Sequence, residues 1–570
     1  MVVLGVLSGL AAALLIVAFR LLIDTPLAMA FGANEDDFES LSPVFRFLVP
    51  FTGAVLLGIV LSVIRKEHHS VSVSHVLERL HNYQGKMPAA NIATQFFGGI
   101  VALLSGQSVG REGPSIHLGA GIASQLGQRL KLPNNALRTL VACGAAAGIA
   151  ASFNTPMAAV VFAMEVILME YTITGFIPVI LASVLGAAIN QLVFGTELSF
   201  VAIENQGSLI TELPFMVLSG AVFALCAASF IRIHLWCLQQ SERPVWLRFL
   251  IIGLLTGSVA IFLPQILGTG YDTLNQAMTH SIDLQLLVAV VVAKLLVTAA
   301  VTGLGMVGGI IGPTLMIGGC LGAVMGWLGN AMAPSASEPG FYVVLGMVAM
   351  MGAVLNAPLA ALVAILELSH NPSILFPAML LVVVACLGVQ VVFSYQGIFA
   401  EQLRVKGHDL YAEPGKGFLS RVGVRSVMNR SFAVVSAPLQ KHRLADYVAA
   451  ETIWLVVKTD NVERDAPASA QESPVPESGY RLLAMADLAR YLELENNGEE
   501  DSAEILKLSE LPAQQFDIAP LDSLASLHDA TIAMRSSGAQ VLLVIENYGY
   551  AESRVIGIIT RATLNNYYGM

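Results

Sequence analysis

Residues 110–119 read Gly110-Arg-Glu-Gly-Pro-Ser-Ile-His-Leu-Gly119, and 199 positions later the chain reads Gly309-Ile-Ile-Gly-Pro-Thr-Leu-Met-Ile-Gly318. A second pair of motifs follows in the same order. Asn154-Thr-Pro-Met-Ala-Ala-Val-Val-Phe-Ala-Met-Glu165 returns, 202 positions on, as Asn356-Ala-Pro-Leu-Ala-Ala-Leu-Val-Ala-Ile-Leu-Glu367. Two motifs repeated in order at nearly one offset indicate two related halves. Apolar segments interrupted by Gly and Pro at matching places predict a binding site between the halves, near a bilayer midplane.

The composition around these motifs is that of a membrane protein. Hydrophobic residues make up 55% of the 570, charged residues 12%, and the mean hydropathy is +0.70. A soluble fold needs more polar surface than this. Apolar runs long enough to cross a bilayer lie at 1–19, 48–64, 176–194, 212–233, 246–263, 284–304 and 374–393. Shorter pieces broken by Gly and Pro lie at 96–127, 139–169, 305–328 and 341–368, and the first run is interpreted as a membrane helix, not a signal peptide.

The polar residues concentrate in a C-terminal tail. Residues 401–570 hold 23 of the 41 acidic and 16 of the 30 basic side chains. We therefore expect a membrane domain over 1–406 and a water-exposed domain over 407–570, with linkers near 460–479 and 495–504. Within the tail, 539–546 and 554–560 are predicted strands and 523–536 a helix, which is typical of a small α/β regulatory domain. Basic residues before the tail place it in the cytoplasm.

The two Gly-Pro loops suit anion binding. An anion in a low-dielectric pore must replace its water shell, yet a full positive charge would hold it too tightly to conduct. Helix N-termini offer unpaired N–H donors and roughly half a positive charge. Gly permits close approach and Pro is at home in a first helical turn. The pair of loops predicts two half-helices whose N-termini point at one site.

Glu112 lies inside the first loop. Its carboxylate can occupy the anion site when ionised and leave it when protonated, so the side chain would act as gate and proton carrier. The alternative is a carboxylate that caps a helix. Glu165, Glu367 and the lone Lys294 are interpreted as structural, and so are Arg111 and His117, because charges at membrane depth must be paired.

Together these motifs resemble the CLC family of voltage-gated chloride channels and proton-chloride exchangers over essentially the whole chain. The resemblance implies an all-α polytopic domain of two inverted-topology halves, a homodimer with one pore per subunit, and Glu112 as the gate. It implies that the amides of Ile310 and Ile311 bind the central chloride. The filter loops would comprise Gly110, Arg111, Gly113, Pro114, Gly309, Gly312 and Pro313.

The chain departs from the family pattern at three places. The first filter motif, usually Gly-Ser-Gly-Ile-Pro, is replaced by His69-Ser-Val-Ser-Val-Ser-His75, so the hydroxyl donor is Ser70 or Ser72, and we prefer Ser72. Phe399 stands where the family has a pore tyrosine, which removes that hydrogen bond to the anion. Val166 stands where many exchangers have an inner proton-carrying glutamate.

These departures favour passive, channel-like conduction of chloride or a similar small anion. The alternative is proton-coupled chloride antiport, or fluoride antiport, through Glu112, with Glu165 or water as the inner carrier. Other classes are disfavoured. No enzyme motif such as His-Glu-x-x-His or a Ser-His-Asp set is apparent, no metal site is expected, and clustered Lys and Arg for nucleic acid are absent from the sequence.

The tail resembles a pair of CBS motifs. Val424-Arg-Ser-Val-Met-Asn429 is similar to the opening of the first motif, and Gly557-Ile-Ile-Thr-Arg-Ala-Thr563 to the close of the second. Members that bind adenine nucleotides typically end the closing motif with Asp, where this chain has Thr563. We therefore expect no cofactor, with an adenine nucleotide as the disfavoured alternative. The expected location is a bacterial inner membrane, with lipid around many spans.

Overall fold

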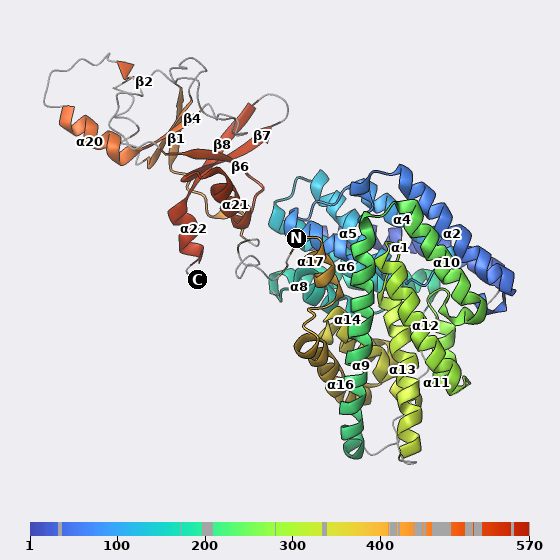
Figure 1. Cartoon of the computed structure of the whole chain (residues 1–570). Helices are drawn as coiled ribbons and strands as arrows, with labels where there is room; N and C mark the ends of the chain where they lie inside the picture. The colour runs from blue at the N-terminus through green and yellow to red at the C-terminus, as the bar shows by residue number, and fades with distance from the viewer. Residues whose placement is uncertain are drawn as a thin grey trace. The chain divides into compact units, whose positions relative to one another are not determined.

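The chain folds as two units in a computed structural model (Figure 1). The structure describes residues 1–31, 37–171, 173–195, 209–279, 281–332, 339–408, 422–436, 439–440, 452–458, 480–495, 505–506, 516–548 and 552–568, and the single positions 410, 419 and 447. The first unit comprises 1–130 and 136–412, and the second comprises 131–135 and 413–570. The division thus falls six residues after the predicted 406/407 boundary. The predicted linkers at 460–479 and, beyond its first residue, at 495–504 lie outside the described residues.

The first unit is helical. Its first half contains α1 (Val2–Phe31), α2 (Pro43–Val63), α3 (Ser72–Asn82), α4 (Ala89–Leu104), α5 (Glu112–Arg129), α6 (Asn134–Phe153), α7 (Pro156–Phe162), a π-helical continuation η3 (Ala163–Leu168) and α8 (Ile173–Phe194). Its second half contains α9 (Leu209–Leu238), α10 (Val245–Phe262), η5 (Pro264–Ile266), α11 (Tyr271–Met278), α12 (Leu284–Gly303), α13 (Ile311–Met332), α14 (Pro339–Leu355), α15 (Pro358–Ser369), α16 (Leu375–Leu387) and α17 (Ile398–Val405).

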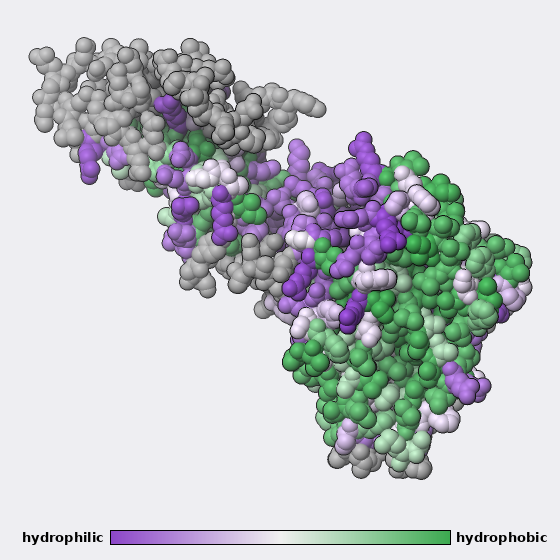
Figure 2. All heavy atoms as spheres, viewed as in Figure 1, coloured by the Kyte–Doolittle hydropathy of each residue, from purple (hydrophilic) through white to green (hydrophobic). Residues whose placement is uncertain are grey.

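The outer surface of this unit is apolar. Among the described residues, nine helices are long and apolar enough to cross a membrane. Figure 2 shows a broad hydrophobic surface over them. Val63, Leu192 and Phe262 are 82–85% exposed, which lipid tolerates and water does not. The chain is a multi-pass integral membrane protein.

Helix α13 continues for 22 residues from Ile311, and its Pro313 lies in the first turn, where no intrahelical N–H bond is lost, as the loop motif predicted. One span differs from the sequence expectation. Helix α1 continues past residue 19 to Phe31, since Arg20 Nε pairs with Asp24 Oδ2 one turn away at 3.4 Å and the two charges neutralise each other. The expected breaks lie between α4 and α5, α6 and α7, α12 and α13, and α14 and α15.

Reciprocal helix caps relate the two halves. Both carboxylate oxygens of Glu367, on α15, accept from the amides of Met157 and Ala158 at the start of α7, each at 2.8 Å. Glu165, in η3, which continues α7, accepts in the same way from the first turn of α15, at 3.1 and 2.7 Å. Because each helix caps the start of its repeat equivalent, the two run antiparallel and the halves are inverted. Both glutamates are structural, as expected.

The membrane core packs on glycine. A Cβ on Gly119 of α5 would lie 2.2 Å from the carbonyl oxygen of Gly144 on α6. The second half repeats the contact, where a Cβ on Gly318 of α13 would lie 2.3 Å from the carbonyl oxygen of Gly346 on α14. Helix backbones approach this closely only without side chains, as in other membrane helix pairs. The interrupted helices are thereby held in the interior.

The second unit contains two small sheets of one design. Strands β1 (Phe432–Ser436), β3 (Trp454–Lys458) and β4 (Tyr480–Ala484) form one sheet, and β6 (Ile518–Asp522), β7 (Val541–Tyr548) and β8 (Glu552–Thr560) form the other. In each, the first pair is parallel and the second antiparallel. Helices α20 (Met485–Glu495), α21 (Leu527–Ser537) and α22 (Arg561–Tyr568) accompany them, with the short pair β2 (Leu439–Gln440) and β5 (Ile505–Leu506). The predicted helix and two strands are confirmed.

Glu367→Ala should destabilise the protein. It removes two charge-assisted hydrogen bonds to the first turn of α7, so the free energy of unfolding should fall by about 2 kcal/mol. Thermal unfolding in detergent should show a lower midpoint than the parent. Asp283→Asn is the matched control, because Asp283 starts α12, is exposed and makes no side-chain cap bond. An unchanged midpoint in Glu367→Ala would show that the caps add nothing to stability.

Candidate anion pathway

The two filter loops are hydrogen-bonded to each other. The amide of Gly110 donates to the carbonyl of Gly309, and the amide of Gly309 donates to the carbonyl of Gly110, both at 2.8 Å. The pair is a single antiparallel bridge between segments 199 positions apart. It brings the starts of α5 and α13 to one place, as the repeated motif predicted.

Glycine is required at this junction. A Cβ on Gly113 would lie 2.8 Å from Gly309 Cα, and a Cβ on Gly309 would lie 2.6 Å from the amide nitrogen of Gly113. Ile310 and Ile311 follow directly and are buried. The first-turn amides of a helix have no intrahelical acceptor, so those of α5 and α13 point their donors at the junction. Such an arrangement can replace the water shell of a small anion.

The carboxylate of Glu112 lies in the junction itself. Glu112 is 1% exposed. A Cβ on Gly312 would lie 2.6 Å from Glu112 Oε1, and one on Gly110 would lie 2.0 Å from Oε2. The acid is therefore held between the two loops, against the start of α13. The Tyr271 hydroxyl donates to Oε1 at 3.0 Å.

Arg111, beside the gate candidate, is paired. Its Nη1 lies 3.5 Å from Asp24 Oδ1 on α1. Asp24 also pairs with Arg20, whose guanidinium stacks on the Phe194 ring. These contacts fix the loop before α5 and agree with a structural interpretation of Arg111.

A cavity of about 450 Å³ opens onto the filter. Its lining includes Ser72, Ile310 and Phe399, three residues that the sequence assigned to anion binding. Phe399 lies in the first turn of α17 and is buried. The structure thus brings these positions together in the wall of one cavity.

The walls of this cavity are positively charged. Basic side chains come from four separate segments: Lys66, Arg243, Arg248 and Lys406. Of the described lining residues, Glu242 is the single acid. One sign of charge in a cleft with low-dielectric walls raises the local concentration of the opposite ion. The cavity favours anions.

His234 adds a neutral group to the same wall. The Thr302 hydroxyl donates to the Thr298 carbonyl at 2.6 Å, so it accepts from His234 Nδ1 at 3.0 Å. His234 Nε2 then accepts from the Gln402 amide at 2.6 Å. The imidazole is held as its Nδ1–H tautomer.

Ser72 and the alternative, Ser70, both line this cavity, and Ser72 has a contact with the first filter loop. The Ser72 Oγ is 2.8 Å from where a Gly113 Cβ would be. Ser72 has φ +68°, and its amide donates to Gln95 Oε1 at 2.8 Å. The Ser70 carbonyl accepts from Asn91. The hydroxyl of Ser72 therefore faces the start of α5.

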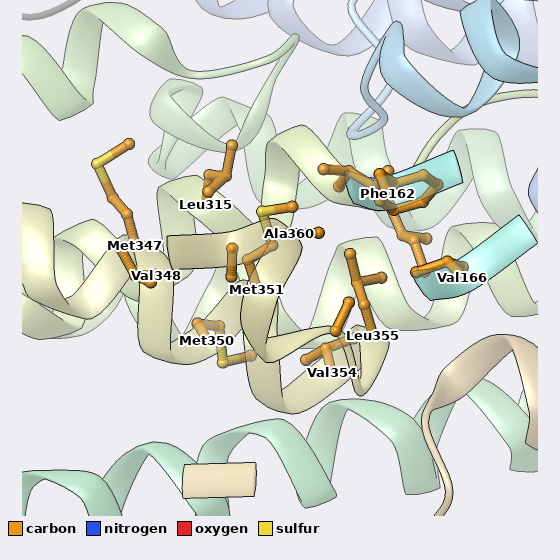
Figure 3. Packing of buried hydrophobic residues seen from close by; sticks show 14 of the residues in the cluster. Phe162, Val166, Leu315, Met347, Val348, Met350, Met351, Val354, Leu355 and Ala360 are labelled. Atoms are coloured by element: carbon orange, nitrogen blue, oxygen red, sulfur yellow. The ribbon is translucent and has the colours of Figure 1, made fainter. Parts of the chain in front are cut away.

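Val166 is part of the apolar interior. It is 8% exposed and lies beside Phe162 in the hydrophobic cluster (Figure 3). A second cavity, of about 40 Å³, has Glu112 in its wall together with Phe162, Ala158 and Ala360. It has room for water but is lined almost wholly by apolar side chains.

The sequence analysis missed Tyr271, whose hydroxyl contacts Glu112. The sequence did contain a signal for it, because Tyr271 stands 199 positions after Ser72, which is the offset of the two filter loops. His75 Nδ1 and His117 Nε2 form a buried pair at 2.8 Å between α3 and α5, which supports a structural His117. Among the described residues, no group of three or more His, Cys, Asp or Glu is arranged to hold a metal.

Comparison with known proteins agrees with this geometry. The family model described as "Voltage gated chloride channel" matches residues 52–390. A chloride channel protein described as ClcB-like, from Ralstonia nicotianae, is 30% identical over 389 residues, covering 66% of this chain and 90% of that protein. The H(+)/Cl(-) exchange transporter ClcA of Vibrio parahaemolyticus is 26% identical over 325 residues, covering 54% of this chain and 67% of its own.

Solved structures share the fold. A slow cyanobacterial Cl-/H+ antiporter superposes with a TM-score of 0.62 at 21% identity, covering 71% of this chain and 97% of the other. A CLC-type fluoride/proton antiporter superposes with a TM-score of 0.59 at 21% identity, covering 70% of this chain and 97% of the other. A eukaryotic CLC transporter gives 0.60 at 17% identity and covers 99% of this chain and 97% of that one. These similarities show the fold alone.

Gly309→Ala should abolish most transport. The added methyl collides with the Gly113 backbone and breaks the Gly110–Gly309 pair, so two bonds worth about 1 kcal/mol each are lost and flux should fall more than tenfold. Chloride efflux from liposomes measures it. Gly423→Ala is the control, because a Cβ there has its nearest heavy atom at 3.6 Å. Parent-like flux from well-folded Gly309→Ala would contradict the assigned junction.

Proposed function

Since this chain belongs to the voltage-gated chloride channel (CLC) family, whose members named above are transporters and not enzymes, we propose that it conducts chloride passively through a glutamate-gated pore. Anion transport of the CLC type follows from the family, and the passive mode is the proposal. The observation that carries it is the Gly110–Gly309 pair, which joins the starts of α5 and α13 around the carboxylate of Glu112.

The anion is held by partial charges. Chloride enters from the basic cavity and meets the Ser72 hydroxyl and the amides of Ile310 and Ile311. Helix ends supply attraction without a fixed cation, so binding is strong enough to replace water and weak enough for release. Phe399 supplies an apolar wall where a phenol would add a further hydrogen bond.

Glu112 is the gate. When ionised, its carboxylate fills the position against Gly312 that an anion would take, and the same donors that suit chloride suit it. When protonated, it no longer competes for those donors and leaves. External acid therefore opens the pore.

Passive conduction is supported by Val166. Coupled exchange needs a proton carrier between the gate and the inner solution, and an isopropyl side chain within the apolar cluster cannot accept a proton.

Proton-coupled exchange is the second candidate, and the 40 Å³ cavity favours it. This cavity runs from Glu112 to Ala360, whose amide is bonded to Glu165. Water there would connect the two carboxylates without Val166. Relatives named as H(+)/Cl(-) exchangers and a fluoride/proton antiporter of the same fold agree with this candidate. Comparing chloride with fluoride efflux distinguishes the two anions.

The remaining assignments concern the surroundings of the pore. We place the basic cavity on the cytoplasmic side, because Lys406 in its wall lies shortly before the tail. The tail is a CBS pair, supported by its two sheets of one topology. It binds no nucleotide, because Thr563 bonds to Thr560 and offers no carboxylate to a ribose. The protein is a homodimer, with one pore in each subunit, in the inner membrane of a bacterium and surrounded by lipid.

Glu112→Gln should open the pore at all pH values. The amide mimics the protonated acid, so chloride flux at neutral pH should rise several-fold and lose its dependence on external pH. Efflux from proteoliposomes over external pH 4–8 measures both the flux and its pH dependence. The lower end of this range is set by the ordinary glutamate pKa of about 4.3. Asp283→Asn should keep the parent profile. A parent-like pH response in Glu112→Gln would refute the gate.

The two transport modes make opposite predictions for protons. In liposomes with a chloride gradient and no proton gradient, a passive pore dissipates chloride and leaves internal pH unchanged when the voltage is clamped. Uphill proton movement driven by chloride would reject passive conduction and select exchange. Glu165→Gln would then be expected to slow proton movement.

A further inference from the structure

Tyr271 contacts the gate from a part of the fold that the filter motifs do not include. It is the first residue of α11, and its hydroxyl donates to Glu112 Oε1 at 3.0 Å. A hydrogen bond donated to a carboxylate stabilises the ionised form more than the protonated form. The contact therefore favours the state in which Glu112 blocks the anion site.

Tyr271 is the repeat equivalent of Ser72. Ser72 begins α3 and Tyr271 begins α11, 199 positions apart, the same offset as Gly110 and Gly309. Because the halves are inverted, the two short helices approach the junction from opposite sides. Ser72 lines the basic cavity, whereas Tyr271 meets the carboxylate. The same repeat position thus supplies one hydroxyl to the basic cavity and one to the Glu112 carboxylate.

The start of α11 is held in place by buried contacts. Lys294, on α12, is fully buried and donates from Nζ to the carbonyls of Ile266 and Gly268, at 2.7 and 2.8 Å. Gln95, its equivalent 199 positions earlier, bonds the amide of Ser72. Gly270 has φ +80°, and a Cβ there would lie 2.2 Å from the sulfur of Met316. The backbone before Tyr271 has little freedom to move.

We propose that Tyr271 is a positioning residue for the gate: its hydroxyl holds the ionised carboxylate of Glu112 in the anion site and sets the acidity at which the pore opens. The proposal rests on the gate role of Glu112. Release of the carboxylate requires breaking this bond, so protonation of Glu112 and release from Tyr271 are coupled.

The other charged or titratable groups named near Glu112 have partners of their own. Asp24 of α1 pairs with Arg111, on the loop before Glu112, and with Arg20 on its own helix. His75 and His117 face each other between α3 and α5, and Lys294 is bonded to carbonyls. From α6, α7, α13, α14 and α15, the described residues that share the small cavity with Glu112 are uncharged. The Tyr271 side chain donates directly to the Glu112 carboxylate, at 3.0 Å.

Tyr271→Phe tests the proposal, because it removes the hydroxyl and keeps the ring. Chloride efflux as a function of external pH should have its midpoint shifted to higher pH by about 1 unit, a tenfold lower proton concentration, and flux at neutral pH should increase. Tyr342→Phe is the matched control. Tyr342 is buried, whereas Tyr271 is half-buried, and it too donates to a carboxylate, that of Glu212, at 2.7 Å. Glu212 is not part of the filter loops, so the Tyr342→Phe profile should match the parent's.

The double variant Tyr271→Phe/Glu112→Ala shows whether the effect passes through the gate. Its flux should equal that of Glu112→Ala alone. If Tyr271→Phe keeps the parent midpoint, or changes flux equally without Glu112, the positioning role is overturned. If Glu112→Gln retains the parent's pH response, the gate assignment fails first, and the two failures are therefore distinguishable. Size-exclusion profiles of all variants confirm that each remains folded.

Discussion

The pair of hydrogen bonds between Gly110 and Gly309 is the contact on which the transport site depends. It joins the loops before α5 and α13 and leaves no room for side chains. With that contact in place, two sets of first-turn amides share one small volume, and a dehydrated anion or a carboxylate can occupy it. Glu112 occupies it in this structure, which is why one residue can compete with the transported ion.

The inverted repeat places equivalent residues in both halves, but only some of these residues make equivalent contacts. Glu165 and Glu367 exchange equivalent caps, so that pair is symmetric. Ser72 and Tyr271 are equivalent in position but differ in partner, as are Gln95 and Lys294. A symmetric scaffold therefore carries different contacts in its two halves: Ser72 lines the basic cavity, and Tyr271 donates to the carboxylate of Glu112.

Much of the fold was predictable because membrane helices and repeated motifs leave local signals. The apolar runs, the breaks near residues 110, 155, 309 and 357, and the tail strands are confirmed. Helix α13 begins at Ile311 with Pro313 in its first turn, as the Gly-Pro loop predicted. The end of α1 was placed too early because a local ion pair between Arg20 and Asp24 cannot be recognised from hydropathy.

The sequence by itself determined the family, the paired halves and the identity of the gate candidate, because Gly, Pro and Glu at fixed spacing have restricted roles inside a membrane. The repeated motifs did not show whether the halves are inverted; the resemblance implied it, and the reciprocal caps in the tertiary structure show it. Only the tertiary structure decided the contacts of Ser72, Tyr271 and Lys294 and the basic cavity. Such features bring together side chains from distant segments, and their meeting depends on backbone packing, which no local pattern of residues records.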